Sequence, residues 1–170
     1  LSILFNPVIF GHCAQENMVE LKKFLLTVIR ITGVAAALFI GLLTVYAPEL
    51  LTLWVGSEYA ALAVYAILLI LPIFIQSPAN ILNDVMIAKL KYRQVAVIYC
   101  AAGIFTAILS VIGAYYLGML GIILAGGLCI IFIEGGGILL YTSRLIEVPA
   151  STFLKCLLPG LGMLIITLMF

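Results

Sequence analysis

A single carboxylate interrupts a long apolar segment of this chain and is the side chain best placed to do chemistry. Glu134 stands about 13 residues into the apolar run 121–141, so a helix through that run would hold it near mid-depth in a bilayer. A charged carboxylate is costly there unless it faces a wet cavity, pairs with a cation or takes up a proton. Glu134 is therefore a candidate for substrate contact or proton coupling. The alternative is a neutral hydrogen-bonded carboxyl, or a pair with Arg30.

Two amide side chains share one face of a second apolar run, 60–83. Gln76 and Asn80 lie four residues apart, which places them one above the other on a helix. Pro72 and Pro78 each remove a backbone donor and free a carbonyl, which a membrane tolerates only where protein or a wet cavity satisfies it. The pattern predicts a kinked, partly polar helix that lines an aqueous path. The alternative is hydrogen bonding between helices without any path.

Arg30 lies a turn or two inside the run 24–46, where a long side chain can reach the membrane surface or contact an anionic phosphate. No chemistry for making or breaking bonds is visible. The sequence has no Gly-rich phosphate loop and no nucleophile–His pair, and its only histidine is His12. We expect no enzyme and no cofactor or metal, beyond a coupling proton or sodium ion.

The composition shows which class of protein must hold these residues in place. Of the 170 residues, 66% are hydrophobic and 9% are charged, and the net charge is +1. A soluble domain has about 25% charged residues. Disordered chains and coiled coils also have a larger charged fraction than this chain does. The absence of a basic patch argues against nucleic acid as a partner. The chain is therefore predicted to be an integral membrane protein, with membrane lipids around it.

A helix needs about 20 apolar residues to cross a bilayer, and several runs meet that length. We predict an all-α, polytopic transmembrane bundle. Both ends fall inside apolar runs, so we expect residues 1–170 to be a fragment of a longer protein. The predicted spans are about 24–46, 60–83, 95–117, 121–141 and 153–170, with 1–9 as the tail of an earlier span.

The basic residues predict which side of the membrane each connection occupies. All eight lie at alternate connections, and the connections 47–59 and 118–120 contain none. Because Lys and Arg accumulate on the cytoplasmic side, we expect the basic connections to be cytoplasmic. These residues are Lys22, Lys23, Arg30, Lys89, Lys91, Arg93, Arg144 and Lys155.

Three local patterns predict structure rather than chemistry. Gly33, Ala37 and Gly41 form a stripe of small residues that favours close helix packing. The glycines at 135–137 weaken the helix and indicate either a flexible bend or a close approach by another helix. The segment 48–56 starts with Pro and ends with Gly around a Trp, which is typical of a short helix at the membrane interface; a simple loop is the alternative.

Several short motifs of this chain occur in an order typical of one family. The most specific is Leu53-Trp54-Val55-Gly56-Ser57-Glu58-Tyr59. The outer turn Tyr116-Leu117-Gly118-Met119-Leu120-Gly121 is moderately specific. Weaker matches are Asn6-Pro7, Ala14-Gln15-Glu16-Asn17, Leu21-Lys22, Ala47-Pro48-Glu49-Leu50-Leu51 and Ala88-Lys89-Leu90-Lys91. In this order and spacing the chain resembles the bacterial polysaccharide flippases of the multidrug/oligosaccharidyl-lipid/polysaccharide exporter superfamily.

The resemblance implies two helical lobes around a central cavity, of which this chain would form part of the C-terminal lobe. It implies export of undecaprenyl-diphosphate-linked oligosaccharides by alternating access, in a bacterial cytoplasmic membrane and with a missing N-terminal lobe as partner. The candidate cavity residues are then Arg30, Gln76, Asn80 and Glu134. The chain departs from the family at Ala88, where relatives often have Gly, and in the span 95–117, which lacks an Asn that many relatives carry.

Other functions stay open at this point. A cation-coupled drug antiporter of the same superfamily would need an acidic cavity, and only Glu134 and Asp84 fit that requirement. A lipid II flippase is a near relative by substrate. A membrane enzyme would need catalytic groups in a large loop, and the longest outer connection, 47–59, has only Glu49 and Glu58 as charges. A purely structural bundle is the remaining alternative.

The predicted orientation can be tested by cysteine labelling in intact cells, with the native cysteines replaced. Ser57→Cys lies in an outer connection, so a membrane-impermeant maleimide should label it from outside. Lys91→Cys lies in a basic connection and should be labelled only after the membrane is opened. Equal labelling of both positions from one compartment would contradict the threaded topology.

Overall fold

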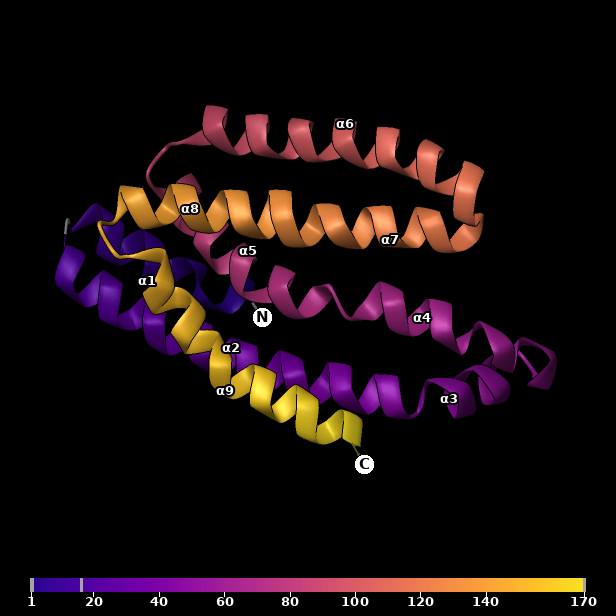
Figure 1. Ribbon diagram of the computed structural model, residues 1–170. Helices are drawn as coiled ribbons and strands as arrows, with labels where there is room; N and C mark the ends of the chain where they lie inside the picture. The colour runs from indigo at the N-terminus through magenta and orange to yellow at the C-terminus, as the bar shows by residue number, and fades with distance from the viewer. Residues whose placement is uncertain (1, 16, 170) are drawn as a thin grey trace.

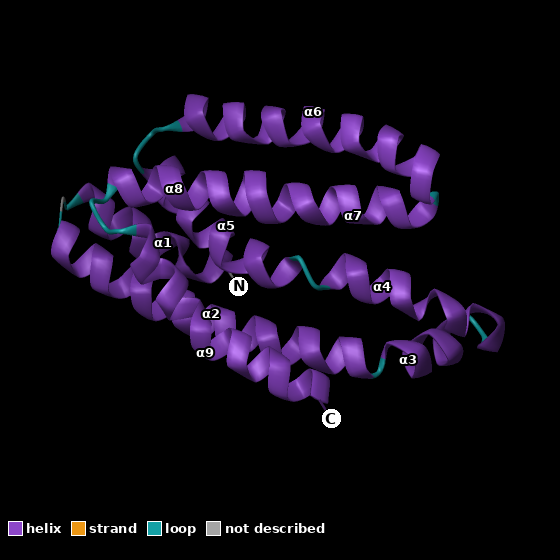
Figure 2. Ribbon diagram, viewed as in Figure 1, coloured by secondary structure: helices purple, strands orange, loops and turns teal. Residues whose placement is uncertain are grey.

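The computed structural model describes residues 2–15 and 17–169, which form helices joined by short turns and contain no strand (Figure 2). The all-α prediction is therefore confirmed. Leu1, Glu16 and Phe170, which belong to the predicted tail, the first connection and the last span, lie outside the described residues. The elements are α1 (Ser2–Ala14), α2 (Met18–Val45), α3 (Ala47–Trp54), η1 (Ser57–Leu62), α4 (Ala63–Ile70), α5 (Ile73–Ala88), α6 (Tyr92–Leu117), α7 (Met119–Cys129), η2 (Ile130–Gly135), α8 (Gly136–Leu145) and α9 (Ala150–Met169).

Within the described part of the chain, five helical segments are long and apolar enough to cross a membrane. Each overlaps one predicted span, and most begin or end a few residues outside it. The helical backbone continues into polar residues at the membrane surface, where hydropathy no longer marks it. The segments are Met18–Val45, Ser57–Ala88, Tyr92–Leu117, Met119–Leu145 and Ala150–Met169.

The second of these segments is broken where the sequence predicts a kink. Helix α4 ends at Ile70 and α5 begins at Ile73, with Leu71 and Pro72 forming the turn between them. The break occurs because a proline has no N–H to donate and its ring crowds the preceding turn. Pro78, in contrast, lies buried inside α5 without ending it.

The short helix predicted for 48–56 is present as α3. Pro48 lies in the first turn of α3, and Gly56 follows the helix with a φ of 117°, a conformation that few other residues adopt. Leu53 and Trp54 at the end of α3 are 86% and 87% exposed. An exposed Trp beside apolar residues suits the headgroup level of a membrane.

Helix α5 lies at the centre of the bundle, between two groups of helices (Figure 1). On one side it contacts α1 and α2, and α9 packs along α2. On the other side it contacts η2 and α8, with α6 beyond them as the outermost helix. The main core joins α5 to both groups through fully buried side chains such as Leu25, Ile81, Val85, Ile138 and Phe153.

The predicted stripe of small residues on α2 lies against α9. Ala37 is completely buried, and a Cβ atom at Gly41 would collide with the side chain of Thr167. A Cβ atom at Gly160 would lie 2.8 Å from the carbonyl oxygen of Gly33. The two helix backbones therefore touch, as expected where lipid provides no hydrophobic drive for helices to associate.

Helices α6 and α7 form a second close pair. Gly118 joins them with a φ of 60°, which favours glycine. A Cβ atom at Gly113 would lie 2.6 Å from the carbonyl oxygen of Gly121, so the backbones meet directly next to the turn. The pair is thus fastened at the end that carries no basic residues.

Gly160→Ala should destabilise the protein by about 1–3 kcal/mol, because the added methyl group meets backbone atoms that cannot move aside. Gly162→Ala is the matched control: it lies in the same helix with no atom within 4 Å of the added Cβ. Both substitutions replace Gly by Ala within one helix, so the gain in helix propensity is the same in each and cancels in the comparison. Thermal unfolding of the full-length protein in detergent measures the difference, and equal melting temperatures would contradict the α2–α9 contact.

Candidate functional site

The candidate site begins on one face of α5, just past the break at Pro72. Gln76, Asn80, Asn83 and Asp84 follow one another at helical spacing, and all four are half-buried. Because i, i+4 and i+7 positions stack on one side of a helix, these residues form a polar strip that runs toward the basic end of the bundle.

Glu134 joins this strip from the neighbouring span. It lies in η2, a π-helix over Ile130–Gly135, and is the sixteenth of the 27 residues in the segment Met119–Leu145. The amide Nε2 of Gln76 donates a hydrogen bond to Oε2 of Glu134, at 3.1 Å. The structure therefore brings together two of the four predicted site residues from segments 58 positions apart.

Glycines lie at the end of the π-helix and directly after it, at 135–137. A π turn contains one residue more than an α turn, and such turns occur often at functional sites. The run 135–137 lowers the helix propensity at this point. Gly135 is buried, and a Cβ atom there would lie 2.8 Å from Cγ2 of Ile75, so glycine lets α5 approach beside Glu134. Gly135 thus provides the close approach that was one of the two predicted roles of this run.

Tyr99 of α6 is a further polar residue on a helix that contacts both α5 and η2. The carboxyl groups of Glu134 and Asp84 act electrostatically on its hydroxyl group. Tyr99 is not among the site residues predicted from the sequence. Its signal would have been a hydroxyl group near the basic end of an otherwise apolar helix, a place where tyrosines are common for interfacial reasons alone.

Two amides in the polar strip have capacity for a ligand. Asn80 has no hydrogen-bond partner among the described residues and lies one turn from Gln76. Oδ1 of Asn83 is buried and lacks a partner within the described part of the chain. Buried amides usually satisfy their donors and acceptors, so these atoms are available to water or to a polar ligand.

Arg30 does not join the other three predicted residues. It is exposed on α2, whereas its neighbours Val28, Ile29 and Thr32 are buried against the bundle. Among the described residues it forms no ion pair, so the alternative in which Arg30 neutralises Glu134 is not realised. The site therefore comprises Gln76, Asn80 and Glu134, with Tyr99 added.

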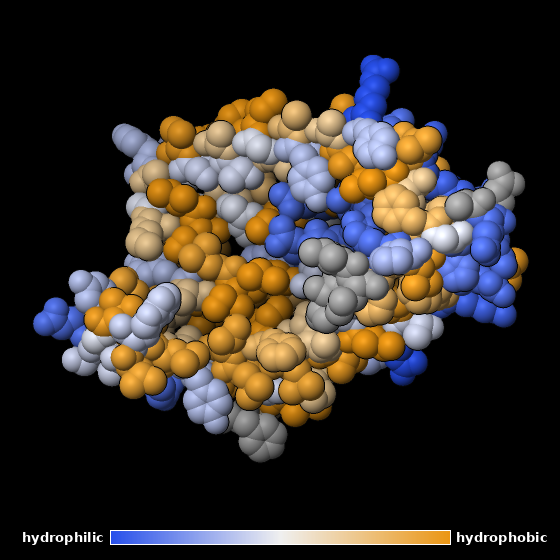
Figure 3. All heavy atoms as spheres, turned by 180° about the vertical axis from the view of Figure 1, so that it is seen from behind, coloured by the Kyte–Doolittle hydropathy of each residue, from blue (hydrophilic) through white to orange (hydrophobic). Residues whose placement is uncertain are grey.

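Hydrophilic residues are unevenly distributed over the surface of the protein. Seen from behind, hydrophilic residues gather at one end and reach toward the middle of the face, which is otherwise mostly hydrophobic (Figure 3). A carboxyl, two amides and a phenol can accept and donate hydrogen bonds, or hold a proton. Across residues 2–15 and 17–169, no group of three or more His, Cys, Asp or Glu could hold a metal ion.

Comparison with curated proteins finds a relative. Over 154 residues the chain is 25% identical to the uncharacterized membrane protein EpsK of Bacillus subtilis (strain 168), a match that covers 89% of this chain. The chain spans about 30% of the length of that curated relative. No protein-family profile and no solved structure matches it. The similarity and the five apolar helices together define a multi-pass membrane protein.

The hydrogen bond between Gln76 and Glu134 should couple the two residues energetically. In a double-mutant cycle with Gln76→Ala and Glu134→Ala, we expect an interaction energy of about 0.6 kcal/mol, and no more than about 1.7 kcal/mol, as found between helices in membranes. Unfolding of the full-length protein in SDS measures it. A cycle with Gln94→Ala, on α6, should give a value close to zero, and equal values in the two cycles would contradict the contact.

Proposed function

We propose that this chain is part of one lobe of a transporter that moves undecaprenyl-diphosphate-linked oligosaccharides across a bacterial cytoplasmic membrane. The observation that carries the proposal is the Gln76–Glu134 hydrogen bond, which holds a polar strip together within apolar spans. Ionisable residues inside membrane segments are rare and generally mark substrate or ion pathways. The family resemblance of the sequence motifs supplies the substrate class.

The chemistry of the strip suits a sugar. Amide groups donate hydrogen bonds to sugar hydroxyl groups and accept hydrogen bonds from them, and carboxylates accept them. The side-chain amide of Asn80 and Oδ1 of Asn83 have no partner among the described residues and can form such bonds. The sugar head would lie against the strip while the prenyl chain stays in lipid. The partner on the other side of the cavity would be the N-terminal lobe of the same protein.

Movement of the substrate would follow from rocking of the two lobes around a fixed site. The break between α4 and α5 and the π-helix η2 both lie beside the polar strip. Interruptions of this kind occur in transporters near the substrate, because freed backbone groups are tolerated only where they line a cavity. The protein is proposed to act without chemical conversion of its substrate, hence not as an enzyme.

A cation-coupled drug antiporter is the second candidate, and Glu134 is the observation that favours it. A carboxylate could receive an organic cation through its charge, and the aromatic face of Tyr99 could add to the attraction. The strip contains Asp84 as its other acidic residue and three amides, so it has more neutral hydrogen-bonding groups than charges, which fits a sugar better. A lipid II flippase would use the same strip for a related head group.

Glu134→Gln should lower the transport rate by about tenfold or more. The glutamine keeps an acceptor oxygen for Gln76 but cannot carry a charge or release a proton. The measurement is the appearance of radiolabelled undecaprenyl-diphosphate-linked oligosaccharide in the opposite leaflet of proteoliposomes that contain the full-length protein.

Glu58→Gln is the matched control. Glu58 is exposed in η1, outside the polar strip, so its replacement should leave the rate within about twofold. Unchanged transport by the Glu134 variant would remove this residue from the mechanism. Uptake of a fluorescent cationic dye by the unmodified protein, without movement of the oligosaccharide, would favour the drug antiporter instead.

A further inference from the structure

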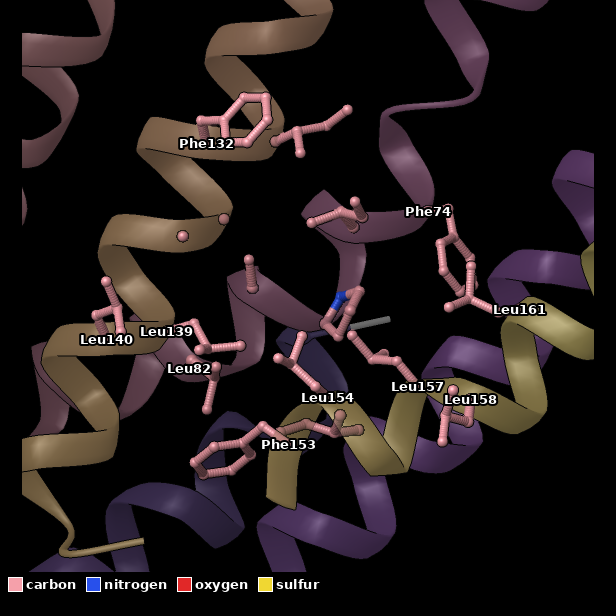
Figure 4. A pocket seen from close by; sticks show the side chains of 17 residues that line it. Phe74, Leu82, Phe132, Leu139, Leu140, Phe153, Leu154, Leu157, Leu158 and Leu161 are labelled. Carbon is pink, nitrogen blue, oxygen red and sulfur yellow. The ribbon is translucent and has the colours of Figure 1, made fainter. Parts of the chain in front are cut away.

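A groove of different chemistry lies on another side of η2. It runs between α8 and α9, with α5 as its floor, and has a volume of about 420 Å³ (Figure 4). Every residue that lines it is hydrophobic, glycine or proline. Gly136 lies in its wall on α8, and Phe74 lies in its floor. Neither Gln76 nor Glu134 contributes to it, so it is separate from the polar strip.

The groove is suited to hydrocarbon. Cavities without polar groups stay dry and take up apolar molecules, and this volume lies within the range of about 300–1,000 Å³ typical of ligand sites. Leucines stand along its rims with half or more of their surface exposed: Leu140 is 54%, Leu154 is 55% and Leu158 is 59% exposed. A hydrocarbon chain could therefore enter from the side, through the apolar spans.

Two cationic residues lie close in the chain to rim residues of the groove, on the two helices that the connection 146–149 joins. Arg144 lies one turn beyond the rim residue Leu140, and Lys155 directly follows the rim residue Leu154. Both are exposed, and neither forms a salt bridge with a described residue. Glu147, in the connection between α8 and α9, is the acidic residue between these two in the chain, so an excess positive charge remains.

We propose that the groove binds one acyl chain of an anionic glycerophospholipid, with the lipid phosphate held by Arg144 and Lys155. The apolar lining favours a hydrocarbon chain, and the two positive charges favour an anionic head group over a neutral or zwitterionic one. A transmembrane helix, about 10–12 Å across, is too wide to enter a space of this volume and would cover it only with side chains. The inference is independent of which substrate the protein transports.

The test compares two lipids that share their acyl chains. The full-length protein is placed in nanodiscs of equal phosphatidylglycerol and phosphatidylcholine, extracted with mild detergent, and examined for retained lipid by native mass spectrometry. Phosphatidylglycerol should be retained preferentially. A basic residue beside an anionic head group contributes about 1 kcal/mol, which is about fivefold in affinity, so Arg144→Gln and Lys155→Gln should each lower the ratio for a lipid bound in the groove by about that factor.

Two controls separate the groove from the general membrane charge. Lys22→Gln with Lys23→Gln removes two charges from the same basic side but from α2, and should leave the ratio unchanged. Gly136→Leu places a side chain in the groove, where only the carbonyl oxygen of Ile131 lies within 4 Å of the added Cβ, and should reduce lipid retention at least severalfold. Gly103→Leu, on α6 with open space around it, should not.

Several outcomes would overturn the proposal. Equal retention of the two lipids, or a ratio that survives removal of both charges, would exclude the head-group site. Full retention by the Gly136 variant would exclude the groove as the place of binding. Absence of retained lipid, together with crosslinking of Leu158→Cys to another segment of the full-length protein, would assign the groove to helix packing.

Discussion

The structure depends on one constraint: the interior of a bilayer offers no hydrogen-bond partner, so a polar group there must find one within the protein or in a water-filled cavity. This constraint explains why α5 is the central helix. It carries the amides of the polar strip and lies beside the helix break at Pro72, and it packs against helices on both sides. The amide of Gln76 meets the carboxyl of Glu134, and Thr142 donates a hydrogen bond to the carbonyl of Leu82 at 3.4 Å.

The π-helix η2 separates two surfaces of opposite chemistry. Its Glu134 belongs to the polar strip, whereas Ile131, Phe132 and Gly135 line the apolar groove. An amphiphilic substrate needs both kinds of environment, one for its head and one for its chain, although here the two surfaces can serve different molecules. Since η2 contributes residues to both surfaces, a change in its geometry would alter the polar strip and the apolar groove together.

Hydropathy predicted the apolar helices because length and apolarity are direct requirements of the bilayer. Proline and glycine predicted the break at Pro72 and close packing at the small-residue stripe of α2 for equally local reasons, but not that α9 is the partner of that stripe. The π-helix was not predicted, because one additional residue in a turn leaves the apolar pattern almost unchanged. The sequence left open whether Arg30 reaches the membrane surface or faces a phosphate, and it did not indicate Tyr99. Which face of a helix is covered depends on its neighbours, and spacing along one helix does not contain that information.

The α6–α7 pair has a mechanical consequence. The backbones touch at Gly113 and Gly121 beside the turn at Gly118, so the turn joins the two helices there and neither can move closer to the other. Tyr99 lies near the opposite end of α6, about 20 residues from that turn, or roughly 30 Å along a helix. A small tilt of α6 about the turn at Gly118 would therefore move Tyr99 much farther than it moves the residues beside the turn. Such a tilt would change the distance between the phenol and Glu134 while Gly113 and Gly121 stay in contact.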